Sequence, residues 1–501
     1  MKSLPVLTAL IGASTIAGPA LADGGYYTGA VGPRAAGRGG AFVARADDLT
    51  AVSINPAGLA EIDGTTIQVG NQLAYYGYDY TRAPTLDWGH AMNGVAPLVT
   101  FDRVSNGTPW QAILPFIGAA SRFGLRDWAF AAAVFAPPGI SREQFPESGG
   151  QRLMMVDREA LIVNADVSAA WRFRDLFGVG LTLEWITVPR LDYSLVINAN
   201  PLAATANPVS GEYDILAQTT GSDWLTFNAI VGGWYRPRPW LELGVAGQVI
   251  PANIVTNSNL ALAPQKPLNP QDTMRVTSVT TGRNGGSGSD VKITLPLPLM
   301  ARAGGRYRHL RGAREVFDVE VDVEYESWSR TKAFSLDTNG LVATPMGNLA
   351  SAPVPLDQIQ IAKHWNDVFS VKLGGDFNLV PDRWTLRAGT YYETAVAPAA
   401  YANVDFPGGQ VFGAAFGGSL FLRRLEIALT YQLRYQPSFS VSEADGRVYQ
   451  QVPGNSCKAP YTDPYTCNPN YLGQPAPTVN AGTYSSTSHL VSLALIYRYG
   501  K

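Results

Sequence analysis

Residues 29–60 read GAVGPRAAGRGGAFVARADDLTAVSINPAGLA, a stretch rich in glycine and alanine and only weakly periodic. It is too apolar for a free tail and too irregular for a strand. Asp47 or Asp48 is placed to cap one short helix. Asn55 is placed to cap a second, with Pro56 at the first helical position, where a missing N–H has no cost. Such a segment needs walls made by other residues, and we predict that the rest of the chain encloses it.

The C-terminal half of the sequence indicates what those walls are. Residues 426–436 alternate strictly between an apolar face, with Leu429, Leu433 and Tyr435, and a polar face, with Glu426 and Gln432. Residues 484–499 repeat this pattern with a single exception. A period of two predicts β-strands whose two faces lie in different environments. A soluble β-sandwich alternates in the same way, so the period alone does not identify the architecture.

The lengths of the connections between strands do identify it. Short connections near residues 124–127, 174–176, 237–239, 309–314, 380–383 and 423–424 alternate with long ones at 81–108, 138–156, 198–222, 258–289, 339–355, 398–409 and 442–483. Short turns on one side and long loops on the other are typical of outer-membrane barrels. Six turns and seven loops predict an all-β fold, a 14-stranded antiparallel transmembrane β-barrel. The N-terminal segment would fold inside the lumen and block it, and we call this segment the hatch.

The expected strands follow from these connections. They lie at residues 65–80, 109–123, 128–137, 157–173, 177–197, 223–236, 240–257, 290–308, 315–337, 356–379, 384–397, 410–422, 425–441 and 484–499.

Composition and the start of the chain agree with an exported membrane protein. Charged residues make up 16% of the chain, against about 25% in soluble domains. Residues 1–22 combine Lys2, a mostly apolar run and a small-residue cleavage pattern, as in a signal peptide; Pro5 and Gly12 disfavour the alternative of a buried helix. We predict a signal peptide at 1–22, a hatch at 23–64 and a barrel at 65–501, in the outer membrane of a Gram-negative bacterium. The net charge of −2 gives no indication of a nucleic-acid partner.

Charged residues alternate on two neighbouring expected strands. The polar positions of these strands, which would face the lumen, are Arg302, Arg306, Arg308, Asp318, Glu320, Asp322, Glu324 and Glu326. The turn at 309–314 is expected to bring Arg306 near Asp318 and Arg302 near Asp322. Arg34, Arg38 and Arg45 of the hatch could dock on the acidic wall. Two hypotheses remain open: a structural ladder that holds the hatch, and a polar relay for a substrate or ions.

Residues 127–138 are apolar on both faces, so the part of the barrel wall that they form should be apolar on its lumen face as well as on its lipid face. Phe135 lies in this run, and Pro137 and Pro138 then remove two backbone donors. A second candidate for an apolar lining comprises Phe412, Phe416, Leu420 and Leu422.

Signals for catalysis and for bound metals or cofactors are weak. The four histidines are scattered without metal-ligand spacing, and no nucleophile motif is present. We expect no enzymatic activity, no metal and no cofactor. Cys457 and Cys467 are expected to form a disulfide that closes a small surface loop, as exported proteins allow.

The Gly-rich lead, Asp47-Asp48 and the element Asn55-Pro56-Ala57-Gly58 just before the first strand resemble the FadL/TodX family of long-chain fatty-acid and hydrocarbon transporters. The resemblance extends loosely over nearly the whole mature chain. It implies a monomeric barrel in contact with outer-membrane lipid and lipopolysaccharide. It also implies a hatch that shifts around Asn55-Pro56-Ala57, and a kinked third strand that opens a side exit to the bilayer. Phe135, Pro137 and Pro138 are the matching region here, although a simple strand end explains them equally well.

The expected function is therefore outer-membrane passage of a fatty acid or another hydrophobic small molecule. Two alternatives remain. A diffusion porin would need charges around the whole lumen, and a surface adhesin or receptor barrel could use the long last loop without transport.

Overall fold

The computed structural model describes residues 31–87, 92–137, 139, 141–198, 211–267, 272–283, 291–347, 354–355, 358–406, 408–449, 470–471, 474–475 and 478–500. The predicted signal peptide, Pro138, Cys457 and Cys467 lie outside these residues.

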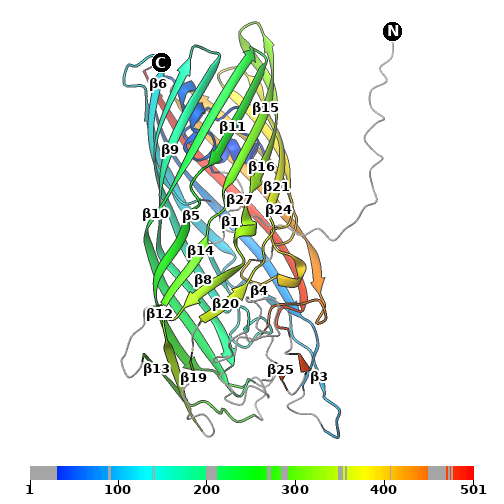
Figure 1. The fold of residues 1–501 in the computed structure, drawn as a ribbon. Coiled ribbons are helices and arrows are strands. Elements are labelled where there is room, and N and C mark those ends of the chain that lie inside the picture. Colours follow the sequence, from blue (N-terminus) through cyan, green and yellow to red (C-terminus); the bar gives the residue numbers. More distant parts are fainter. Residues whose placement is uncertain are drawn as a thin grey trace, which may run out of the picture.

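Fourteen antiparallel segments form a closed barrel, as predicted (Figure 1). We call each segment a stave, whether it is one strand or two strand pieces in line. Closure comes from the first and last strands, which pair from Thr65–Tyr499 to Arg82–Gly482. Ten staves are single strands: β1 (Thr65–Arg82), β5 (Trp110–Ser121), β6 (Trp128–Phe135), β8 (Asp157–Phe173), β9 (Phe177–Asn198), β10 (Asp214–Arg238), β22 (Trp384–Glu393), β23 (Val411–Leu422), β24 (Leu425–Val441) and β27 (Gly482–Tyr499).

The other four staves are broken in two, which the sequence did not predict. Their pieces are β11 (Leu241–Gln248) with β12 (Asn253–Pro264), β14 (Val291–Pro296) with β15 (Met300–Arg311), β16 (Arg314–Glu326) with β17 (Ala333–Asp337), and β20 (Gln358–Ala362) with β21 (Val368–Val380). Pro251 and Pro298 lie in two of the breaks, where a residue without an N–H cannot continue the ladder. The other two breaks turn Trp328 and Trp365 into the interior, with their ring centroids 5.3 Å apart.

Short elements complete the loop end of the barrel. They are β2 (Thr85–Leu86), β3 (Leu98–Val99), β4 (Val104–Ser105), β7 (Arg142–Gln144), β13 (Ser278–Arg283), β18 (Leu341–Met346), β19 (Val354–Pro355), η4 (Ala399–Tyr401), β25 (Asn470–Tyr471) and β26 (Gln474–Pro475). The 3-10 helix η3 (Trp328–Arg330) lies in the break between β16 and β17. The strands extend further into the predicted loops than expected, because β10 begins at Asp214 and β12 continues to Pro264.

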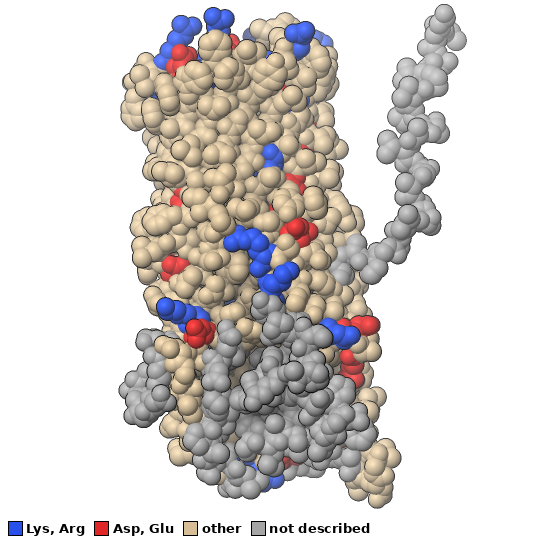
Figure 2. Space-filling model, viewed as in Figure 1, with Lys and Arg blue, Asp and Glu red and all other residues tan. Residues whose placement is uncertain are grey.

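The two faces of each stave differ as the period of two predicts. On β16, Val319, Val321 and Val323 are 42–50% exposed, whereas the alternate Asp318, Glu320 and Asp322 are at most 2% exposed. Most of the surface between the turn end and mid-height carries no charge on the face drawn in Figure 2. Among the described residues, no helix has both the length and the apolar character that crossing a bilayer requires. The side chains facing outward are therefore those suited to lipid.

The second apolar lining proposed from the sequence is wrong. Phe412 and Phe416 are 46% and 63% exposed and belong to the outer face of β23. The strand is apolar on that side because lipid lies there.

The hatch lies inside the barrel near its turn end (Figure 1) and comprises α1 (Pro33–Gly37), α2 (Ala51–Ile54) and the 3-10 helix η1 (Pro56–Glu61). Asn55 caps η1 as predicted: its side-chain oxygen accepts from the N–H of Ala57, and Pro56 takes the first position. Neither Asp47 nor Asp48 caps α2, whose N-cap is Thr50.

One side of the hatch is apolar and packs on the greasy wall predicted from residues 127–138. The hatch contributes Phe42, Leu49, Val52 and Leu59, and the wall contributes Phe116, Ala129, Ala131, Ala133, Phe135 and Ala170. Burial of these side chains supplies the non-directional part of the contact.

Glycines on the lumen face leave room for the hatch backbone to approach barrel strands outside the apolar wall. A Cβ on Gly232 would lie 2.1 Å from Asn55 Oδ1, and one on Gly180 would lie 2.4 Å from the backbone of Pro56 and Ala57. Gly244 and Gly389 meet Val43 and Arg38 in the same way. Asn55 uses this closeness, because its Nδ2 donates to the carbonyls of Val43 (2.8 Å) and Gly233 (3.1 Å).

We expect Gly232→Ala to destabilise the docked position of the hatch by about 1–3 kcal/mol of free energy, the usual cost of overpacking. Gly233→Ala is the matched control, because a Cβ there meets nothing closer than 3.6 Å. Limited proteolysis of the hatch in detergent micelles measures the difference. Equal cleavage rates for the two variants would show that the close approach is unimportant.

Candidate functional site

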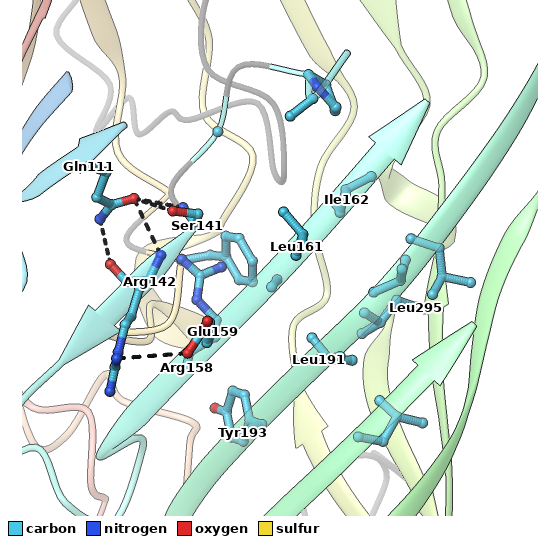
Figure 3. A pocket seen from close by; sticks show the side chains of 18 of the residues that line it. Gln111, Ser141, Arg142, Arg158, Glu159, Leu161, Ile162, Leu191, Tyr193 and Leu295 are labelled. Atoms are coloured by element: carbon cyan, nitrogen blue, oxygen red, sulfur yellow. Dashed lines mark hydrogen bonds and ion pairs between the residues drawn. The ribbon is translucent and has the colours of Figure 1, made fainter. Parts of the chain in front are cut away.

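An apolar cavity of about 440 Å³ lies in the lumen, toward the loop end. Figure 3 shows side chains that line it. Its apolar lining includes Leu161, Ile162, Leu191, Ile254, Leu295 and Phe334. These side chains come from β8, β9, β12, β14 and β17, so residues far apart in the sequence form one surface. The volume is within the range of about 300–1,000 Å³ that small-molecule sites occupy.

The charged groups at this cavity are already paired. Arg158 donates to Glu143 at 2.9 Å and lies 4.2 Å from the ring centroid of Phe406. Arg142 donates to Asp157 at 3.0 Å. A ligand in the cavity therefore meets hydrocarbon and neutralised ion pairs.

One wall of the cavity is a break in barrel pairing between β5 and β6. These strands pair from Ser121–Phe130 to Ile117–Val134, and no further. If that register continued, Pro115 would face Ala136, and Pro137 would face Leu114. Pro115 lies within β5 and Pro137 lies two residues beyond the end of β6. Both lack the N–H that a ladder needs, so the pairing ends here. Ala112, Ala136 and Pro137 line the cavity at this gap.

The far edge of the gap is held chiefly by the side chain of Gln111, and Thr108 and Asn106 also bond this segment. Gln111 accepts from the N–H of Ser141 (2.8 Å) and from its hydroxyl (2.7 Å), and donates to the carbonyl of Arg142 (2.6 Å) (Figure 3). β7 then pairs with β8 at Arg142–Glu159. The chain thus returns to the barrel after the gap, so bonded segments border the gap on both sides.

The three residues predicted for this region have different positions. Phe135 is buried, with its ring centroid 5.4 Å from that of Phe116, against the hatch. Pro137 lines the cavity. Pro138 lies outside the described residues.

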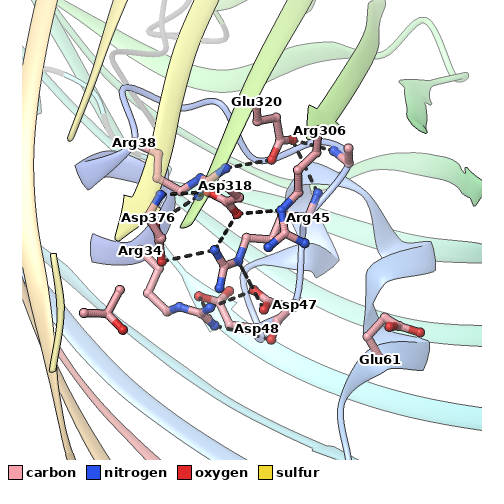
Figure 4. Close-up of polar contacts among 12 residues, drawn as sticks. Arg34, Arg38, Arg45, Asp47, Asp48, Glu61, Arg306, Asp318, Glu320 and Asp376 are labelled. Carbon is pink, nitrogen blue, oxygen red and sulfur yellow. Dashed lines mark hydrogen bonds and ion pairs between the residues drawn. The ribbon is translucent and has the colours of Figure 1, made fainter. Parts of the chain in front are cut away.

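A second site joins the hatch to the acidic strand β16 (Figure 4). Arg38 is fully buried and donates to Asp318 (2.7 Å), Glu320 (2.9 Å) and Asp376 (2.9 Å). Arg45 contacts Asp318 at 2.8 Å and Asp376 at 3.1 Å. We call Arg38, Arg45, Asp318, Glu320, Asp322 and Asp376 the hatch latch.

Carboxylates of the latch also bind the hatch backbone. Asp322 Oδ2 accepts from the N–H groups of Phe42 (2.7 Å) and Val43 (2.9 Å). Glu320 Oε1 accepts from the N–H of Ala44 at 2.7 Å. Carboxylates thereby satisfy irregular backbone that has no ladder partner. This geometry supports the hypothesis of a ladder that holds the hatch.

Two expectations about the arginines need correction. Arg302 bonds Glu324 at 2.7 Å rather than Asp322, because the tight turn of β15 and β16 sets Arg302 opposite Glu324. Arg34 docks elsewhere, at 3.7 Å from Glu426 on β24 and 2.8 Å from Asp47. Arg306 bonds Asp318 at 2.5 Å, within the pair of strands expected.

The pKa values of two neighbouring hatch carboxyls shift in opposite directions, although burial raises both. Burial alone would raise the pKa of Asp47, but Arg34 and Arg45 outweigh it and hold that pKa well below its ordinary value. Burial raises the pKa of Asp48 above its ordinary value, although Arg34 opposes it. Asp47 is therefore a charged partner of the arginines.

Sequence reasoning missed several residues of these sites. Asp376 completes the coordination of Arg38, and its alternation with Lys372 and Gly374 on a lumen face was the available signal. Pro115 could have been noticed as a proline inside an expected strand. Among the described residues, no group of three or more His, Cys, Asp or Glu side chains is arranged to hold a metal ion.

Comparison with known proteins then gives the family. Residues 14–457 match the family model described as "Outer membrane protein transport protein (OMPP1/FadL/TodX)". The chain belongs to the OMPP1/FadL/TodX family. Members of the FadL/TodX family are outer-membrane transporters of hydrophobic compounds, which places this barrel in the Gram-negative outer membrane.

Solved structures similar to the chain share its fold at low identity. They include a FadL homologue of Pseudomonas aeruginosa (16% identity, TM-score 0.69, covering 95% of this chain and 100% of that one). The toluene transporters TbuX of Ralstonia pickettii (14%, TM-score 0.57) and TodX of P. putida (13%, TM-score 0.58) each cover 94% of this chain and 99% of their own. A search of the curated proteins found no match.

We expect Arg38→Met to weaken the binding of the hatch to the wall, because its bonds to three carboxylates are lost. Removing one partner of a buried ion cluster typically costs about 3–5 kcal/mol, so protection of hatch amides should fall by about 100-fold or more. Hydrogen exchange of peptides from residues 33–61, followed by mass spectrometry, measures this change. Arg103→Met, at a 64% exposed side chain, is the control and should leave exchange unchanged. Equal protection in both variants would contradict the latch.

Proposed function

We propose that the protein carries neutral hydrophobic small molecules across the outer membrane and releases them sideways through the gap between β5 and β6. The observation that carries this proposal is the apolar cavity whose wall is that gap. A pocket open toward the lipid side lets an apolar ligand pass from lumen to bilayer without crossing water.

Charge pairing in the cavity favours a neutral ligand over a fatty acid. A carboxylate entering the cavity would add a negative charge where Arg158 and Arg142 are already neutralised by Glu143 and Asp157. Burying an uncompensated charge is unfavourable. A hydrocarbon gains roughly 0.8 kcal/mol for each methylene removed from water, with no such cost. Since the similar toluene transporters are under 25% identical, they support the fold, and the ligand class rests on the cavity itself.

Lateral release also agrees with the strength of the hatch latch. An inward path would require the ion pairs of Arg38 and Arg45 to break, whereas the gap lies on the loop side of the hatch. In the proposed sequence, the loops capture the ligand, the cavity holds it, and movement of Phe135 with the adjoining hatch element Asn55-Pro56-Ala57-Gly58 clears the exit. The ladder residues Arg302, Arg306, Asp318, Glu320, Asp322 and Glu324 keep the hatch in the lumen during transport.

We further propose three features of the mature protein. Residues 1–22 are cleaved as a signal peptide, Cys457 and Cys467 form a disulfide, and the barrel acts as a monomer among outer-membrane lipid and lipopolysaccharide. A diffusion porin is disfavoured because the hatch occupies the lumen, and an adhesin gives no role to the apolar cavity.

Filling the cavity should stop uptake. Ala160 lines it on β8, and Ala160→Trp is expected to lower uptake of radiolabelled toluene by at least about tenfold, because the ring takes the space of the ligand. Ala169→Trp is the matched control on the same strand, since Ala169 pairs with the lipid-facing Leu181.

The measurement uses a deletion strain complemented with each variant, supplied in parallel with labelled oleate. Preferential uptake of oleate by the wild type would make the fatty acid the ligand. Toluene uptake unaffected by Ala160→Trp would contradict the cavity as the binding site.

Restoring donors across the gap should slow release. Pro115→Ala combined with Pro137→Ala returns two N–H groups, so β5 and β6 can pair further and narrow the exit. We expect uptake to fall several-fold while toluene binding to the purified protein stays unchanged. Unchanged uptake with longer pairing, seen in amide exchange of residues 110–137, would rule out the lateral exit.

A further inference from the structure

The short turns of the barrel share one residue type. Each of the six turns carries at least one exposed arginine. These residues are Arg126, Arg174, Arg238, Arg311, Arg314, Arg383, Arg423 and Arg424. We call this set the turn ring. No turn contains a lysine.

The arginines of the turn ring have no ionic partners among the residues that the structure describes. In the lumen, by contrast, Arg38, Arg306 and Arg387 are each paired with carboxylates. The unpaired acids at the turns are Asp127, Asp175 and Asp382, against eight arginines. The chain as a whole carries a net charge of −2, so positive charge is concentrated at this end. Blue Lys and Arg side chains lie along the upper rim in Figure 2, which is the turn end of the barrel.

The turn ring lies at the edge of the lipid-facing surface. Arg174 stacks on Phe173 at 5.1 Å, and Arg424 stacks on Tyr499 at 5.4 Å. Both rings are exposed, as are Trp128, Trp240 and Trp384 near other turns. Exposed aromatic residues form the girdle at the level of lipid head groups. Arginines stacked on girdle residues therefore lie at that level too.

We propose that the turn ring binds the phosphate groups of anionic phospholipids in the leaflet at the turn end of the barrel. Guanidinium groups present several N–H donors in a plane and bind phosphate oxygens in pairs, which lysine cannot do. The arginines occupy every turn around the circumference. A ring of this kind fits a membrane plane, whereas a single acidic protein would contact one sector. The bound lipids fix the depth of the barrel in the bilayer.

The test counts lipids bound to the purified full-length protein by native mass spectrometry in neutral detergent. The probes are palmitoyl-oleoyl phosphatidylglycerol and the corresponding phosphatidylcholine. The wild type should retain several-fold more phosphatidylglycerol than phosphatidylcholine. The variant Arg174→Gln, Arg383→Gln, Arg424→Gln should lose most of that excess, at least threefold, and the three Arg→Lys changes should restore part of it.

The matched control removes three exposed arginines from the loop end, through Arg103→Gln, Arg190→Gln and Arg447→Gln. It should retain phosphatidylglycerol as the wild type does, and heat-modifiable migration shows that each variant is folded. Equal retention by the turn variant, or an equal loss in the control, would overturn the proposal. The first of these outcomes would leave an acidic periplasmic protein as the partner that the turn ring fits.

Discussion

Placing Arg38 in the lumen constrains everything around it. A guanidinium removed from water needs acceptors for its N–H groups and a balancing charge, and Asp318, Glu320 and Asp376 supply both from two staves. Those carboxylates in turn would repel one another without Arg38, Arg45 and Arg306. The charges of the hatch and of the wall are thus balanced while the two are in contact, and separating them would leave buried charges unpaired. The glycines opposite the latch complete the arrangement, because they let Asn55 and Pro56 reach the opposite wall.

Sequence reasoning succeeded where one physical rule acts on many residues. Lipid outside and hatch or water inside impose the same alternation on every stave. The number of strands, and which side chains face lipid or the lumen, could therefore be predicted. The docking of Arg38 and Arg45 on the acidic strand followed from charge alone. Arg34 had the same charge and went to Glu426, because position along the folded hatch decides which wall each arginine meets.

Features that depend on register or on distant residues could not be predicted. Arg302 meets Glu324 instead of Asp322 because the turn between β15 and β16 is tighter than the sequence indicated. The cavity draws Leu191, Leu295 and Phe334 from separate staves, and no local pattern links them. The gap beside it needed Pro115 and Pro137 to be considered together, across a turn, as members of one interrupted ladder.

The four broken staves separate two levels of the lumen. Their pieces on the turn side, β11, β15, β16 and β21, supply Glu242, Arg306, Asp318 and Asp376 to the ion pairs around the hatch. Their pieces on the loop side, β12, β14, β17 and β20, supply Ile254, Leu295, Phe334 and Ile361 to the cavity. Substitutions at the loop-side level change apolar side chains that take no part in the ion pairs around the hatch. Cargo preference can therefore drift during evolution while the seal of the pore is inherited unchanged.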